Sequence, residues 1–139
     1  MPDVFMQSVS VRAVSPNTSD GIAGGSIVAG NFLYRETDGT YKVADCLTAL
    51  KANVVGIALN NAVAGQPIAF TRVGEIQLQP SAFFAYGDII ILSQTPGKAK
   101  YLSDVVSNVD YVTLLGYAMT DRSFMLTIHA TGLQYVAMP

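Results

Sequence analysis

The chain has 139 residues, of which 50% are apolar and 13% are charged, and its formal net charge is −2. This length fits one domain, and the charged share is well below the roughly 25% of an average soluble domain, so part of the surface is expected to be covered by copies of the chain or by a partner. The charge excludes a basic nucleic-acid footprint, and one cysteine with one histidine excludes an internal disulfide and multi-cysteine or multi-histidine metal sites.

Short β-strands separated by turns are predicted along most of the chain. Residues 7–14 and 75–79 alternate apolar and polar side chains, and Asp38-Gly39 and Pro96-Gly97 supply turns between β-favouring runs. About ten strands are expected, over residues 7–14, 32–35, 41–43, 54–59, 66–73, 75–79, 88–92, 99–102, 111–115, 123–128 and 133–136. This pattern predicts an all-β fold, a compact β-barrel or sandwich.

Residues 45–53 form the only window that fits a helix, and the same residues fit a loop equally well. Residues 1–11 lack the basic and apolar regions of a secretory signal. No apolar run approaches the 18 or so residues of a membrane span, because the most apolar stretch is residues 89–92. We therefore expect no membrane partner.

Residues 29–79 and 86–136 share one order of features. Each contains a Gly-Asx pair, a strand, a turn with glycine, a second strand, a spacer and an apolar segment with a central glycine. Gly30 matches Gly87, and Gly56 matches Gly116. Chance similarity between β-hairpins is the alternative. The repeat predicts two related β-units within one domain over residues 26–139, with residues 1–25 as an N-terminal arm.

Residue types that support catalysis occur here without the partners that catalysis needs. His129 has no carboxylate beside it in the sequence, and Cys46 lies in an apolar window, where a free cysteine packs as a small apolar residue. The aspartates fall mostly at turns or strand starts, as their turn chemistry favours: Asp38, Asp45, Asp88, Asp104 and Asp110. The chain also lacks a phosphate-binding loop and metal-ligand spacing. We expect no enzyme, no cofactor and no metal.

Two segments are candidate partner contacts. An aromatic cluster follows Pro80, and it either packs at the seam between the β-units or contacts a neighbouring subunit. The N-terminal arm either belongs to the chain's own sheet or adds a strand to the sheet of a partner. The candidate contact residues are Val4, Phe5, Val9 and Val11 in the arm and Phe83, Phe84 and Tyr86 in the cluster.

The segment over residues 54–68, followed by Val-Gly-Glu-Ile at 73–76, resembles the capsid cement (head decoration) proteins of tailed bacteriophages. The Gly-Asx elements at 30–31 and 87–88 fit the same family, and the resemblance covers roughly residues 25–128. Asn31 and Gln66 depart from acidic residues usual in the family, and the N-terminal arm is not matched.

The resemblance implies a non-enzymatic protein, made in the host cytoplasm, that binds the outer surface of a phage head. It would bridge neighbouring capsomers and so resist the internal pressure of the head. Its partners would be the major capsid protein and its own copies, with which it would form a homotrimer. The alternative is a β-sandwich recognition module of a phage tail or cell surface that binds a carbohydrate or receptor. A small β subunit of a bacterial assembly is a third hypothesis.

Overall fold

The computed structural model describes residues 10–13, 18–79, 87–93, 95–101, 111–120 and 123–134, and these residues form eleven β-strands and no helix. The strands of the first half are β1 (Ser10–Ala13), β2 (Thr18–Ile22), β3 (Phe32–Arg35), β4 (Tyr41–Val43), β5 (Val54–Ala58), β6 (Pro67–Thr71) and β7 (Val73–Gln79). The strands of the second half are β8 (Ile89–Leu92), β9 (Ala99–Tyr101), β10 (Tyr111–Thr120) and β11 (Ser123–Gln134).

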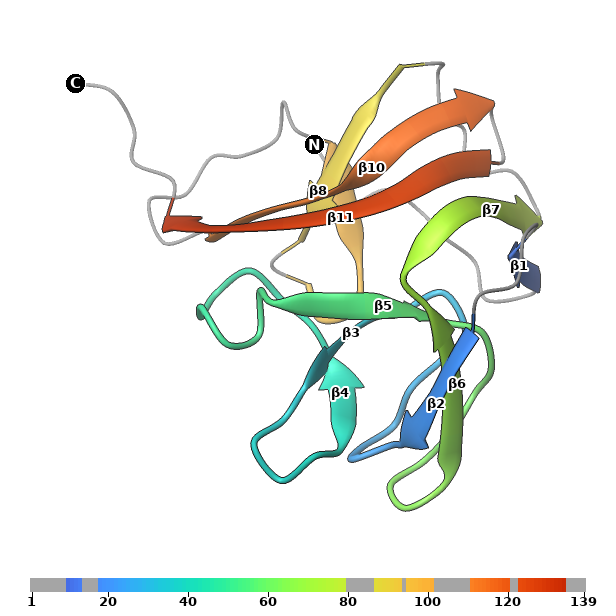
Figure 1. Cartoon of the computed structure of the whole chain (residues 1–139), viewed down its shortest axis with the longest axis vertical. Helices are drawn as coiled ribbons and strands as arrows, with labels where there is room; N and C mark the ends of the chain where they lie inside the picture. The colour runs from blue at the N-terminus through green and yellow to red at the C-terminus, as the bar shows by residue number, and fades with distance from the viewer. Residues whose placement is uncertain are drawn as a thin grey trace.

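The described strands form two antiparallel sheets that pack face to face (Figure 1). A six-stranded sheet has the order β1-β7-β11-β10-β8-β9, and a five-stranded sheet has the order β2-β6-β5-β3-β4. The all-β prediction is confirmed. Of the two architectures left open by the sequence, the structure is a β-sandwich and not a closed barrel.

The main core lies between the two sheets. The five-stranded sheet contributes fully buried Phe32 and Ile57, and the six-stranded sheet contributes Ile90, Leu115 and Phe124. The rings of Phe32 and Phe124 meet across the interface, with centroids 6.5 Å apart. These aromatic and branched side chains exclude water from the space between the sheets and hold the layers together.

The five-stranded sheet curls around a second, smaller core. Its edge strands meet at one point, where Ala23 and Tyr41 form an isolated parallel bridge and the Gly24 N–H donates to the Tyr41 carbonyl at 2.8 Å. Leu33 and Phe70 are buried inside this curl, away from the six-stranded sheet. Strand β3 is consequently covered on both faces over its first three residues, since Phe32 and Tyr34 face the main core.

The two sheets share one strand order, because β6-β5-β3-β4 in one corresponds to β11-β10-β8-β9 in the other. Equivalent hydrogen bonds join equivalent residues. The Gly30 N–H donates to the Ala58 carbonyl, as the Gly87 N–H donates to the Ala118 carbonyl, both at 2.9 Å. The register also shifts next to Gly56 in one sheet and next to Gly116 in the other. These matches fall at the glycine pairs Gly30/Gly87 and Gly56/Gly116 of the sequence repeat.

The described residues of two segments bear on alternatives that the sequence leaves open, while residues 1–9 and 14–17 of the arm lie outside the described part of the chain. Within residues 1–25, Ser10–Ala13 pairs with β7 and Thr18–Ile22 pairs with β6, so both strands belong to the protein's own sheets. Residues 45–53 form turns rather than a helix. The Cys46 carbonyl accepts the Tyr111 N–H at 2.7 Å and the Ala52 carbonyl accepts the Thr113 hydroxyl at 2.5 Å, so the loop is tied to β10.

The chain crosses from one sheet to the other at Arg72. This residue lies between the end of β6 in the five-stranded sheet and the start of β7 in the six-stranded sheet. The sequence predicts that Gly74 breaks or bulges a strand; the strand breaks at Arg72, and Gly74 lies within β7, opposite Leu126 of β11. Strand β11 also runs without interruption through the segment where the sequence predicts two separate strands.

Candidate functional site

Most of the predicted contact residues lie outside the described part of the chain. The structure describes the backbone of Val11, which lies in β1 opposite Leu78 of β7. The other predicted contacts stay predictions: Val4, Phe5, Val9, Phe83, Phe84 and Tyr86.

The described residues whose side-chain types can act in catalysis lie in different parts of the structure. Cys46 is fully buried in the main core, and His129 is exposed on β11 opposite Leu114. Asp38 lies in the β3–β4 turn, where its carboxylate accepts the Thr40 N–H at 2.9 Å and the Thr40 hydroxyl at 2.7 Å. No group of three or more His, Cys, Asp or Glu residues that could hold a metal ion occurs among the described residues.

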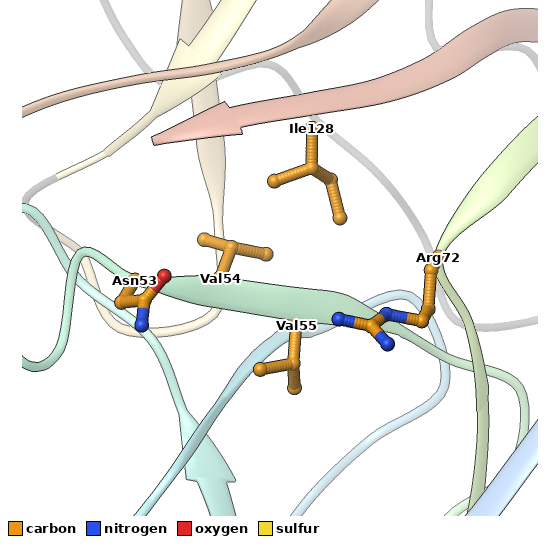
Figure 2. Close-up of a pocket in the computed structure, with 5 residues that line it drawn as sticks. All are labelled: Asn53, Val54, Val55, Arg72 and Ile128. Atoms are coloured by element: carbon orange, nitrogen blue, oxygen red, sulfur yellow. The ribbon is translucent and has the colours of Figure 1, made fainter. Parts of the chain in front are cut away.

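A pocket of about 240 Å³ opens between the two sheets and is shown in Figure 2. Its lining consists of Asn53 just before β5, Val54 and Val55 at the start of β5, Arg72 at the crossover and Ile128 on β11. Val54 and Ile128 point toward each other from the two sheets, and the Arg72 guanidinium reaches along β5 (Figure 2). The pocket is therefore lined by apolar side chains of both sheets and by the polar side chains of Asn53 and Arg72, which lie at its two ends (Figure 2).

The crossover of the chain creates this pocket. Strand β5 pairs with β6 through Ile57↔Thr71 and Ala58↔Phe70, and β6 then ends as the chain leaves for the other sheet. Among the described residues, the first part of β5 has no strand partner at the edge where β6 would otherwise continue. Arg72 follows the last residue of β6, so its long side chain extends along this unpaired edge of β5 (Figure 2).

Arg72 gives the pocket a positive charge that the described residues do not neutralise. The exposed Arg72 guanidinium takes part in no hydrogen bond or ion pair within the described ranges, and neither does the Asn53 side-chain amide. Lys42, by contrast, has Glu36 at 3.8 Å. A guanidinium has five N–H donors and no acceptor, so the pocket opening is suited to an anionic acceptor. The sequence predicts only that Arg72 lies in the strand over residues 66–73. One signal that could point to this residue is that Arg72 is the single cation between two apolar strand segments.

The outer face of the six-stranded sheet has an apolar row. Ile89, Tyr117 and Met125 lie directly opposite one another on β8, β10 and β11, and their sequence neighbours Ile90, Ala118 and Phe124 are buried in the main core. Because side chains alternate along strands, the three residues of the row face away from that core. Ile89 and Tyr117 are each 39% exposed, which is apolar surface available to another protein.

Tyr34 and Glu36 form the most strongly perturbed titrating pair among the described residues. The buried Tyr34 hydroxyl donates to Glu36 Oε2 at 2.7 Å. Burial, together with this hydrogen bond and the nearby negative charge, raises the pKa of Tyr34 to about 12. The same hydrogen bond lowers the pKa of the Glu36 carboxyl. The pair fastens the β3–β4 hairpin, which makes its role structural.

The raised pKa predicts a loss of stability at alkaline pH. The unfolded chain releases the Tyr34 proton near pH 10.0 and the folded chain near pH 12, so the folded form is increasingly destabilised as pH rises through this window. Replacing Tyr34→Phe should flatten this part of the stability profile. Urea unfolding of both proteins at a series of pH values measures it. Parallel profiles from pH 10 to 12 would contradict the assignment.

Within the described residues, no helix is long and apolar enough to cross a membrane. No protein-family model matches the chain, and a search of curated proteins finds no similar sequence.

Proposed function

We propose that the protein is a structural capsid cement protein that binds the outer surface of a tailed-phage head and bridges neighbouring capsomers. The sequence resemblance over roughly residues 25–128 supplies the partner class. The structural observation that carries the proposal is the apolar row of Ile89, Tyr117 and Met125. A rigid sandwich with such a row offers a preformed surface for another protein, and repetition over a closed shell adds many weak contacts.

The mechanism is additive burial of apolar surface at the junctions between capsomers. Each copy holds its neighbours together by contacts that exist only while both neighbours stay in place. A protein that binds the assembled, expanded shell and not its free subunits stabilises the shell by mass action. Its own copies, as a homotrimer, would provide a symmetric bridge at three-fold positions.

The first test is the copy number of the chain in purified virions. We expect about one copy per major capsid subunit after sedimentation of particles from the source lysate, measured by quantitative mass spectrometry. A handful of copies per particle would contradict the cement function and favour the recognition module of a tail. Absence from particles would exclude both phage functions.

A second test of the proposed function changes the apolar row. Tyr117→Lys places a charge in the centre of the row and should lower the occupancy of shells by about tenfold or more, since a central aromatic contact is worth about 2 kcal/mol. Thr18→Lys, at an exposed position of β2, is the matched control and should bind like the unmodified protein. Equal occupancy of the two variants would remove the row from the interface.

A further inference from the structure

We propose that two copies of the protein associate through the edge of β11 that extends beyond β7, residues 128–134, here called the free edge. The free edge of one copy pairs antiparallel with the free edge of the other about a two-fold axis, so that their six-stranded sheets join into one. The inference does not rest on the proposed function, because it concerns the isolated chain. It adds to that function a two-fold contact between copies, at a place distinct from the apolar row.

The free edge exists because β11 is longer than its neighbour β7. The pairing of the two strands ends at Thr127↔Val73, since β7 begins at Val73, directly after the crossover at Arg72. Strand β11 continues through residues 128–134 and extends well past β7 (Figure 1). Within the described ranges, no strand pairs with these seven residues on the β7 side. Their outward N–H and C=O groups are therefore available to another strand.

The opposite side of the same hairpin is covered. Strand β10 also extends beyond its neighbour β8, but the loop over residues 45–53 contacts it there, and the Cys46 carbonyl accepts the Tyr111 N–H at 2.7 Å. On the β11 side, Ile128 and His129 make no hydrogen bond to any described residue outside the β10–β11 hairpin. The hairpin thus has one edge that the fold itself covers and one that it leaves open.

The residue types of the free edge favour the addition of a strand. Charged residues oppose such addition, and each of the four outermost strands of the two sheets carries one: Arg12 in β1, Lys100 in β9, Asp20 in β2 and Lys42 in β4. Residues 128–134 contain no Lys, Arg, Asp, Glu or Pro. We infer that the one long edge without this protection is covered by a partner strand.

A second copy of the chain fits this edge in geometry and charge. In an antiparallel pair each strand offers alternate N–H and C=O groups to the other, so an edge related to itself by a two-fold axis is self-complementary. An axis at residue 131, the centre of the free edge, places residue 129 of one copy opposite residue 133 of the other. The single histidine then lies opposite a leucine, and no like charges meet across the pair.

Sedimentation equilibrium of the whole chain tests the pairing. Between about 1 μM and about 1 mM, we expect the average mass to rise toward twice the 14.7 kDa of one chain. Thr131→Lys places two positive charges opposite each other at the axis and should weaken the association by about tenfold or more. Thr127→Lys is the matched control on the same strand. It lies opposite Val73, where β7 already covers the edge, and should associate like the unmodified protein.

Amide hydrogen exchange of the unmodified protein makes the test independent of how the variants fold. We expect residues 128–134 to exchange more slowly at high than at low protein concentration, with residues 123–127 unchanged, as peptide mass spectrometry measures. A chain that stays monomeric at every concentration, or an association that Thr131→Lys leaves intact, would overturn the inference. Pairing by a chain that is absent from virions would contradict the proposed function and leave the two-fold contact standing.

Discussion

Replacing Gly116→Ala is expected to destabilise the protein by about 3–5 kcal/mol, among the largest effects of any single substitution. Gly116 has φ = +154° and lies where β10 passes against the backbone of β11. A Cβ at this position would overlap the Met125 carbonyl oxygen, and its next neighbour would be the Met125 carbonyl carbon at 2.9 Å. Backbone of a paired strand cannot yield as a flexible side chain can, so the two central strands would have to separate.

The control for this prediction is Gly25→Ala. A Cβ at Gly25 would have open space around it, with nothing within 4 Å, so the free energy of unfolding should change by less than about 0.5 kcal/mol. Gly56→Ala tests the matching position of the other sheet, where a Cβ would lie 2.6 Å from the Thr71 carbonyl oxygen. Urea denaturation of the three variants measures the effect. A Gly116→Ala protein as stable as Gly25→Ala would show that the close approach is not required.

Replacing Phe32→Ala is expected to cost about 3–5 kcal/mol, because it leaves a cavity at the centre of the main core. Phe32 is fully buried, and its ring contacts Phe124 of the opposite sheet at a tilt of 51°. The substitution removes contacts that hold the two layers together rather than contacts within one sheet. Since small domains are stable by about 5–15 kcal/mol, this loss would bring the protein close to unfolding at ordinary temperature.

Two further substitutions make the Phe32 prediction specific. Phe32→Leu keeps an apolar side chain at the interface and should lose clearly less stability than the alanine variant. Val63→Ala changes a side chain that is 53% exposed and should shift stability by less than about 0.5 kcal/mol. Thermal unfolding of all three variants provides the comparison. A loss of less than about 1 kcal/mol for Phe32→Ala would mean that the interface repacks around the gap.

The strands and turns of this protein were predictable from the sequence because their signals are local. Asp38-Gly39 and Pro96-Gly97 each join two short apolar segments, and the hairpins β3–β4 and β8–β9 form there. The curl of the five-stranded sheet was not predictable. It depends on the bridge between Ala23 and Tyr41, which are far apart in the chain and show no pattern that connects them.

The loop at residues 45–53 and the pocket are features whose form could not be predicted from the sequence, because both depend on contacts between distant parts of the chain. The loop sequence suits a short helix, but its Cys46 and Ala52 carbonyls accept hydrogen bonds from β10, which begins about sixty residues later. Tertiary partners outweigh local preference there. Arg72 likewise has no motif around it. Its position in the lining of the pocket follows from the place where the chain changes sheets, which no spacing of residues in the sequence reports.

The pairing of β2 with β6 and of β7 with β11 has a consequence for the speed of folding. Thr18 of β2 pairs with Thr71 of β6, and Gln77 of β7 pairs with Ser123 of β11, so both pairings close loops of about fifty residues. Hairpins such as β3–β4 close after a few residues and can form within microseconds. We therefore expect the hairpins to form early and the distant β2–β6 and β7–β11 pairings to form late, with folding on the millisecond-to-second timescale of proteins dominated by distant pairings.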